Sequence, residues 1–152
     1  MGKFNPNDNK PVYQELAGVF PNGVWATPAY FNNTVYYGAL GAPIKAFPAT
    51  NALLATTPSS QTATSFAYPG ATPSISSSGT ANGIVWAVEN ASTAVLHAYD
   101  ASNLALELYN SNQAAAGRDQ FGNGNKFMTP MIVNGKVFVG TPNGVAVFGL
   151  LP

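Results

Sequence analysis

Residues 128–140 read MTPMIVNGKVFVG, and this stretch decides the fold class of the chain. Two short runs rich in β-branched residues, Met128–Val133 and Lys136–Gly140, flank the dipeptide Asn134-Gly135. Asn-Gly between two such runs is a strong signal for a β-hairpin, because a type I′ turn needs a positive φ angle at both central residues. The stretch therefore predicts two antiparallel strands joined by a tight turn.

A Thr-Pro dipeptide lies at the start of this stretch, and the same dipeptide begins two earlier stretches. The three dipeptides are Thr27-Pro28, Thr72-Pro73 and Thr129-Pro130, so the spacings are 45 and 57 residues. Spacings of this order are typical of four-stranded β-propeller blades with loops of variable length. Pro and Gly recur too often for long helices. The chain is therefore predicted to be all-β, with three blade-like repeats.

Each repeat contains short runs with the composition of strands, separated by Gly, Pro or Asn. The first two repeats have four runs each, at residues 26–31, 34–38, 44–47 and 53–56 and at residues 71–76, 83–88, 94–99 and 104–109. The third repeat has three runs, at residues 128–133, 136–140 and 145–150, and an isolated strand is expected at residues 11–17. The predicted units are an N-terminal segment (1–17), a first blade (18–62), a second blade (63–116) and a third blade without its outer strand (117–152).

The isolated strand and the missing strand together predict an assembly. Propeller sheets bury their faces against neighbouring blades, so three blades alone leave two apolar end faces and an unpaired edge. Exposed apolar patches of that size are rare on monomers. We expect a homodimer that closes a six-bladed ring, in which residues 11–17 of each copy complete the third blade of the other. The alternative is that residues 1–17 are a flexible tail.

Composition excludes several classes of function. The chain is 46% apolar and 8% charged, and six Lys and Arg balance six Asp and Glu, so no basic field favours nucleic acid as a partner. Cysteine is absent, which excludes disulfides and thiolate metal sites. No apolar run has the length of a membrane span, and the first residues are not a signal peptide. The neutral polar composition is typical of exported β proteins, so we expect an exported parent protein whose signal lies outside this chain.

The second repeat resembles the PQQ-binding-like (quinoprotein-type) β-propeller repeat. Gly83–Ala87 (GIVWA) and Leu96–Ala101 (LHAYDA) are similar to its G-x-V-Y and L-Y-A-L-D-A strands. Ile44–Phe47 and Val145–Phe148 are weaker copies of the second of these. The resemblance covers about residues 18–152. It implies a C-terminal, three-blade fragment of a bacterial protein of this superfamily.

The departures from this family bear on cofactors. The T-G that follows the family's Asp is Asn103-Leu104 here, and the family's outer-strand Trp is replaced by Tyr109. Quinone-dependent dehydrogenases of this superfamily also use a vicinal disulfide and acidic calcium ligands, which have no counterpart in this sequence. A shared fold alone does not imply shared chemistry. We therefore expect no PQQ, no other cofactor, no metal and no quinone-dependent dehydrogenase activity.

Propeller ligands bind where loops from all blades converge at a channel mouth. The loops at one such end carry the candidate ligand-binding residues Tyr68, Lys126 and Asn143 and the candidate catalytic residues Glu89, Arg118 and Asp119. His97, the only histidine, would need an acidic partner within hydrogen-bond reach to act as a base. It is expected on the same strand face as Tyr99, which favours a packing role. Asp100 is expected to accept backbone hydrogen bonds in a turn.

These observations leave three hypotheses for function. The first is a non-catalytic module, a self-assembling scaffold or a binding surface, with a small molecule or a glycan as the ligand at the channel. The second is a weak hydrolase or lyase that uses Glu89, Asp119 and Arg118 with His97 at the channel mouth. The third is a structural fragment without an independent role.

Overall fold

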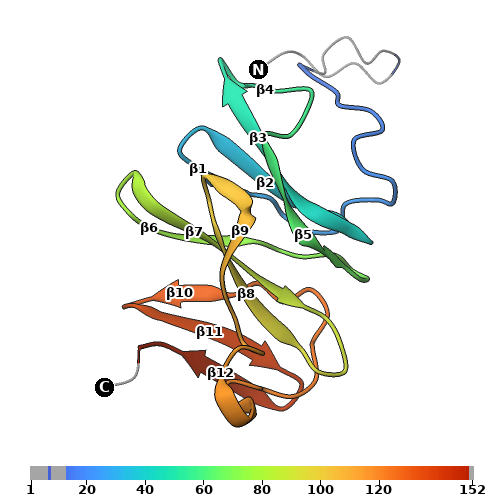
Figure 1. The fold of residues 1–152 in the computed structure, drawn as a ribbon. Coiled ribbons are helices and arrows are strands. Elements are labelled where there is room, and N and C mark those ends of the chain that lie inside the picture. The colour runs from blue at the N-terminus through green and yellow to red at the C-terminus, as the bar shows by residue number, and fades with distance from the viewer. Residues whose placement is uncertain (1–6, 8–12, 151–152) are drawn as a thin grey trace.

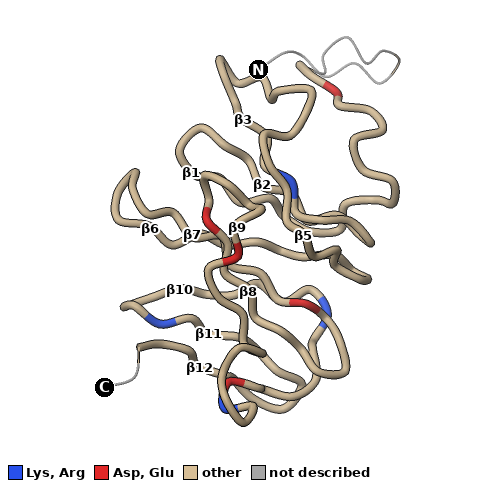
Figure 2. Tube along the Cα trace, in the orientation of Figure 1, with Lys and Arg blue, Asp and Glu red and all other residues tan. Residues whose placement is uncertain are grey.

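The chain is described from a computed structural model, which covers residue 7 and residues 13–150 (Figure 1). These residues form three antiparallel sheets and no α-helix, which confirms the all-β prediction. A 3-10 turn at Ala115–Gly117 lies in the longest connection. Nowhere in the described part is there a helix with the length and apolar character needed to cross a membrane. The charged residues are few and lie scattered over the three sheets (Figure 2).

The second sheet is a four-stranded meander that matches the predicted repeat closely. Its strands are β6 (Ser74–Ser78), β7 (Ala81–Glu89), β8 (Val95–Asp100) and β9 (Asn103–Asn110). At the turn between β8 and β9, the Asp100 carboxylate accepts hydrogen bonds from the hydroxyl and the backbone N–H of Ser102. These bonds lower the pKa of Asp100. The predicted turn role of Asp100 is confirmed.

The first sheet differs from the prediction in its outer strand. Its strands are β1 (Ala29–Phe31), β2 (Thr34–Gly38), β3 (Ala42–Thr50), β4 (Leu53–Leu54) and β5 (Ser60–Phe66). The outer strand expected at residues 53–56 is wrong, because β4 is a two-residue strand that pairs only with the end of β3. The main outer strand is β5, which pairs with the beginning of β3. The first sheet therefore extends to Phe66, past the expected boundary at residue 62.

The third sheet contains the predicted hairpin and, within the described residues, has three strands. These are β10 (Met131–Val133), β11 (Lys136–Thr141) and β12 (Gly144–Phe148). Asn134 and Gly135 have φ angles of 50° and 69°, as a type I′ turn requires. Among the described residues, no strand pairs with the second edge of β12. The described residues thus contain the three strands that the sequence predicts for the third repeat.

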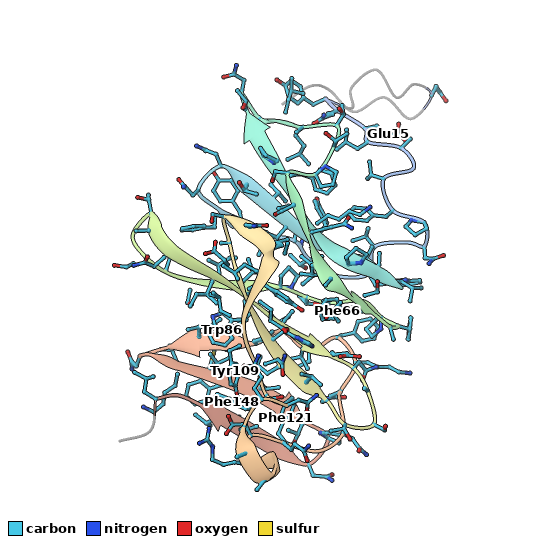
Figure 3. All side chains as sticks on the ribbon, in the orientation of Figure 1. Glu15, Phe66, Trp86, Tyr109, Phe121 and Phe148 are labelled. Carbon is cyan, nitrogen blue, oxygen red and sulfur yellow. The ribbon has the colours of Figure 1, made fainter. Side chains whose placement is uncertain are left out.

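Two hydrophobic clusters hold the three sheets face to face in the order of the chain (Figures 1 and 3). The larger side chains of the first cluster, between the first and second sheets, are Tyr36, Ile44, Phe66, Val85, Tyr99 and Leu104. The second cluster, between the second and third sheets, contains Val88, Leu96, Val137 and Val139 and the partly buried Trp86, Phe121 and Phe148. The inner sheet faces are therefore mainly apolar, as strand alternation allows, and His97 is a buried polar exception between the first two sheets.

Glycine allows a very close approach between β2 and the β5–β6 connection. A Cβ atom on Gly38 would lie 2.2 Å from the carbonyl oxygen of Ala71, and one on Gly70 would lie 2.6 Å from the carbonyl oxygen of Gly38. Also between these sheets, the buried hydroxyl of Tyr36 donates a 2.8 Å hydrogen bond to the carbonyl oxygen of Ala101. Backbone contact and a buried hydrogen bond thus reinforce the apolar packing between the first two sheets.

The outward face of the first sheet is covered by the chain's own N-terminal segment. Phe20 packs against Tyr37 and Phe47, with ring centroids 5.8 and 5.9 Å apart. The Lys45 ammonium lies over the Phe20 ring and donates a 2.8 Å hydrogen bond to the carbonyl oxygen of Val19. The expectation of two uncovered end faces is therefore wrong for this end of the stack, because local chain is available to cover it.

The outward face of the third sheet carries apolar side chains that the rest of the described chain leaves wholly or partly exposed. They are Met131, Val133, Phe138, Val145 and Val147. Three of them, Met131, Phe138 and Val147, lie in one row across the three strands. This end of the stack is the uncovered one, as the sequence predicts.

The strand expected at residues 11–17 is not formed in the part that is described. Residues 13–17 make no strand, and residues 11 and 12 lie outside the described residues. The side-chain amide of Gln14 makes two hydrogen bonds of 2.8 Å with the backbone of Leu54. Its Nε2 donates to the Leu54 carbonyl oxygen, and its Oε1 accepts from the Leu54 N–H. The Tyr13 hydroxyl donates a 3.1 Å bond to the carbonyl oxygen of Asn51. Within one chain, this segment lies against the β3–β4 hairpin.

Candidate functional site

Three exposed aromatic side chains, Trp25, Tyr68 and Phe127, come from the segments that precede the first strand of each sheet, and we refer to them as the aromatic platform. They belong to the segment before β1, the β5–β6 connection and the β9–β10 connection. Their exposed fractions are 59%, 43% and 56%. The Tyr68 ring lies edge-to-face between the other two, with centroids 6.1 Å from Trp25 and 6.2 Å from Phe127. The platform is thus a continuous aromatic surface built from all three repeats.

The long β9–β10 connection is anchored where it approaches the platform. The Gly122 carbonyl oxygen accepts a 2.8 Å bond from the N–H of Ala94, and the Gly124 N–H donates a 2.8 Å bond to the carbonyl oxygen of Ala91. A Cβ atom on Gly124 would lie 2.8 Å from Asn90 Oδ1, so only glycine fits this approach. The connection is therefore held against the β7–β8 turn, two residues before Lys126.

Polar groups of Lys126 and Asn90 border the aromatic platform. The Lys126 ammonium lies 5.3 Å from the centroid of the Tyr68 ring, a cation–π contact. The side-chain amide of Asn90 donates a 2.9 Å hydrogen bond to the carbonyl oxygen of Tyr68. Two of the predicted ligand-binding residues, Tyr68 and Lys126, are therefore brought together. The third, Asn143, lies in the exposed turn between β11 and β12 and is not a member of the platform.

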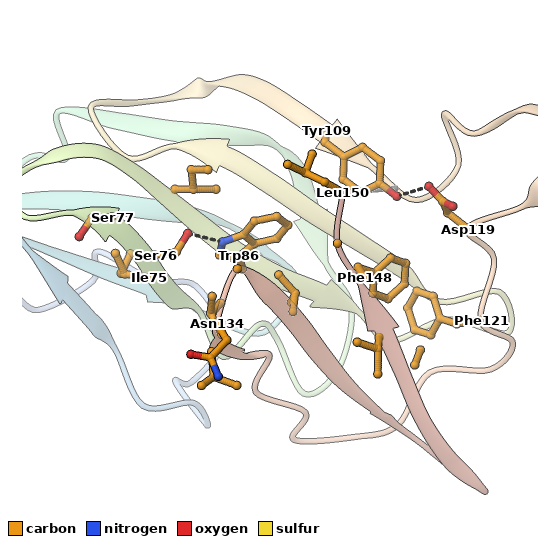
Figure 4. Close-up of a pocket in the computed structure, with 18 of the residues that line it drawn as sticks. Ile75, Ser76, Ser77, Trp86, Tyr109, Asp119, Phe121, Asn134, Phe148 and Leu150 are labelled. Atoms are coloured by element: carbon orange, nitrogen blue, oxygen red, sulfur yellow. Dashed lines mark hydrogen bonds between the residues drawn. The ribbon is translucent and has the colours of Figure 1, made fainter. Parts of the chain in front are cut away.

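A cleft of about 1280 Å³ lies between the second and third sheets (Figure 4). Its lining includes Trp86, Tyr109, Phe121, Phe148 and Leu150. The Trp86 indole N–H donates a 2.8 Å bond to the hydroxyl of Ser76, which is one of the two bonds drawn in Figure 4. The lining is predominantly apolar, and its charged groups are confined to the connection that follows β9.

Those charged groups are Arg118 and Asp119, which form an ion pair at the rim of the cleft. The Arg118 guanidinium donates bonds of 2.7 and 3.0 Å to the two carboxylate oxygens of Asp119. The Tyr109 hydroxyl donates a third bond to the same carboxylate, at 2.6 Å. The bonds from Arg118 and then Tyr109 lower the pKa of Asp119 to about 2. Burial and the neighbouring carboxylate raise the pKa of Tyr109. The three side chains thus hydrogen-bond one another, as in a structural ion pair.

His97 lies between two carboxylates on the opposite face of the second sheet. Its Nδ1 is 2.6 Å from Glu107 Oε1, and its Nε2 is 3.4 Å from Glu89 Oε2. The buried imidazole ring stacks on Tyr99, with an interplanar angle of 8°, and meets the edge of Phe66. His97 therefore has the acidic partner that a base needs, but it is packed inside the interface of the first and second sheets. The predicted shared face with Tyr99 is confirmed.

The candidate catalytic residues do not form one constellation. Glu89 contacts His97 between the first and second sheets, whereas Arg118 and Asp119 line the cleft between the second and third sheets. Glu89 and Trp86 differ by an odd number of positions along β7, so strand alternation directs them to opposite faces. Among the described residues, no group of three or more His, Cys, Asp or Glu side chains is arranged to hold a metal ion.

Sequence reasoning missed three residues that the structure brings into these sites. Trp25 and Phe127 each lie two positions before the Thr of a Thr-Pro dipeptide, a recurrence that marks them as equivalent positions in two repeats. Glu107 pairs with Tyr99 in the sheet register, which places it diagonally opposite His97. The recurrence of an aromatic residue before Thr-Pro is visible in the sequence. The position of Glu107 beside His97 depends on the β8–β9 register, which contains irregular steps.

Comparisons of this chain with family models, with curated proteins and with solved structures find no match. The resemblance to the PQQ-binding-like repeat stays a prediction.

Proposed function

We propose that this chain is half of a β-propeller, and that two copies close a six-bladed ring that serves as a non-catalytic scaffold or binding module. The stacking of the sheets supports this proposal. The first strand of the second sheet, β6, contacts the first strands of both neighbouring sheets, β1 and β10. The last strands of the first two sheets, β5 and β9, also contact each other. Neighbouring propeller blades are related in this way, with inner strands together and outer strands together.

The observation that carries the proposal is the uncovered apolar face of the third sheet. The row Met131, Phe138 and Val147 crosses all three strands, and Val133 and Val145 extend it. Contiguous apolar patches of this kind on soluble proteins mark interaction surfaces. In repeat architectures such a face is covered by the next repeat. A second copy of this chain supplies a sheet of the same architecture.

The unpaired edge of β12 is the second element of the proposed interface. An exposed edge strand offers a row of backbone donors and acceptors to another chain. We infer that residues 11–17 of one copy pair with β12 of the other, as the strand count predicts. In one chain residues 13–17 lie against the β3–β4 hairpin, and the residues that follow, Val19 and Phe20, cover the outward face of the first sheet. The exchange would uncover that face for the partner's third sheet, which is the geometry of a domain swap.

The test is the molar mass in solution, measured by size exclusion with light scattering over a range of concentrations. The proposal expects twice 15.8 kDa. Val147→Lys places a charge on the outward face of β12 and should shift the mass to that of a single chain. Deleting residues 1–17 should also weaken the assembly.

Leu106→Lys provides the matched control. Leu106 lies on β9 of the central sheet, and its exposed fraction, 51%, equals that of Val147, 52%, within one percentage point. Its substitution should leave the dimer intact, because Leu106 belongs to the second sheet and not to the outward face of the third sheet or to β12. A single-chain mass at all concentrations would refute the proposal, and a trimer would imply nine blades and refute the six-bladed ring.

A further inference from the structure

We propose that the aromatic platform binds a neutral oligosaccharide, with Trp25 and Phe127 as the two stacking surfaces. All residues of this site belong to one chain, so the inference does not depend on the proposed dimer. Single exposed aromatic residues are ordinary on protein surfaces. Three neighbouring rings, of which Tyr68 contacts the other two, come from three separate segments and form a built surface whose function requires explanation.

The orientation of the three rings leaves the outer two available to a ligand. Trp25 and Phe127 meet the Tyr68 ring at 76° and 81°, and they are more exposed than Tyr68. Tyr68 is the centre of the platform, because its ring contacts both of the other rings and the Lys126 ammonium lies over it. The outer rings therefore flank a central Tyr–Lys pair, with one aromatic surface on each side.

The chemistry of this surface matches the two kinds of group on a sugar. The faces of aromatic rings are electron-rich and attract the polarised C–H groups on the apolar face of a pyranose. The ammonium of Lys126 and the side-chain amide of Asn90 border the rings, and such groups bond hydroxyls directionally. Binding sites for small ligands commonly combine aromatic walls with a few polar groups.

Two other occupants fit the surface less well. Nucleic acid would also stack on aromatic rings, but the chain has zero net charge and no basic track for phosphates. A stable protein partner buries roughly 800 Å² on each side, which three side chains do not provide. A neutral, amphipathic ligand of a few rings remains the occupant that the size and charge of the platform favour.

The site is also held in place before any ligand arrives. Asn90 donates a bond to the carbonyl oxygen of Tyr68, and Gly124 donates one to Ala91, the residue after Asn90. Both connections are thus fastened to the same β7–β8 turn. A site that needs little ordering on binding loses less of the interaction energy.

Tryptophan fluorescence provides the test, because the chain has two Trp residues. Trp86 is packed between sheets and bonded to Ser76, so a Trp86→Phe background makes Trp25 the reporter. The probes are hexasaccharides of β-1,4-linked glucose, mannose, xylose and N-acetylglucosamine, with a hexauronate as the charged comparison. We expect a saturable change with at least one neutral probe, and calorimetry on the unmodified chain should confirm its affinity.

Variants of the platform separate the expected result from its alternatives. Trp25→Ala, read by calorimetry, should weaken binding about tenfold or more, the order of loss for one stacking ring. Tyr68→Ala should act similarly, and Tyr30→Ala, at an exposed tyrosine of β1 outside the platform, should leave affinity unchanged. Far-UV circular dichroism confirms that each variant is folded. No binding by any neutral probe, binding of the hexauronate alone, or unaltered affinity in folded Trp25→Ala would each overturn the proposal.

Discussion

Replacing Gly38 by Ala tests whether the first two sheets are held together by backbone contact. Gly38 is in β2, and a Cβ atom there would lie 2.2 Å from the carbonyl oxygen and 2.9 Å from the Cβ of Ala71. Because these neighbours are backbone and Cβ atoms, they cannot rotate away as a long side chain can. The β5–β6 connection would have to move away from the first sheet.

The expected cost follows from this overlap. Overpacking a well-packed interior costs about 1–3 kcal/mol. The Ala residue reduces the conformational entropy of the unfolded chain, which offsets roughly 0.4–1 kcal/mol of that cost. A distance of 2.2 Å is a severe overlap, so we expect a net loss of about 2 kcal/mol in the free energy of unfolding. For a chain of this length that corresponds to a fall in melting temperature of roughly 4–8 °C.

Urea and thermal denaturation, followed by far-UV circular dichroism, measure the effect. Gly144→Ala is the matched control, since the atom nearest to its added Cβ is the Thr141 hydroxyl at 3.8 Å. This control should change stability by no more than about 0.5 kcal/mol. Both variants are compared at one dilute concentration, because assembly adds concentration-dependent stability. If Gly38→Ala melts within a degree of the unmodified chain, the close approach between β2 and the β5–β6 connection is wrong.

Two further predictions concern hydrogen bonds of tyrosine and aspartate side chains. Tyr36→Phe removes the buried hydrogen bond to the Ala101 carbonyl oxygen and should lower the free energy of unfolding by about 1–2 kcal/mol. Urea denaturation measures this change, and an unchanged midpoint of the transition would contradict the bond. The pKa of Asp119, about 2, lies below its ordinary value near 4, so its contribution to stability is present above about pH 4 and is lost as the pH falls toward 2. Arg118→Ala should raise the Asp119 pKa in an NMR titration and reduce that acid-side loss, whereas an unmoved pKa would exclude the ion pair.

Much of the fold could be predicted because its signals are local. The Asn134-Gly135 turn requires a backbone conformation that these two residue types adopt readily, and the structure has it. The second sheet matched prediction because its apolar strands are separated by turn residues. The outer strand β5 could not be predicted in this way, since Ser, Thr and Gln dominate it and only Thr62 and Phe66 are buried. An outer strand has less contact with the core, so its hydrophobic pattern is weak.

The candidate sites likewise combine features that local sequence predicts with features that depend on the path of the chain between sheets. That Tyr68 and Lys126 lie at the same end of the sheets followed from strand alternation, and the structure places the ammonium over the ring. That Glu89 and Asp119 lie on opposite faces of the second sheet depended on which side of the sheet the long connection follows. No local preference determines that path.

The sequence by itself determined the Asn134-Gly135 turn, the strands of the second sheet and the three described strands of the third, because turn chemistry and residue alternation act over a few residues. Only the tertiary structure decided that Phe20 covers the first sheet, that Glu107 reaches His97, and that Trp25 and Phe127 meet at Tyr68. Each of these contacts joins residues from separate strands or connections. Their distances depend on how whole sheets pack and register, which is a property of the folded chain and not of any short segment.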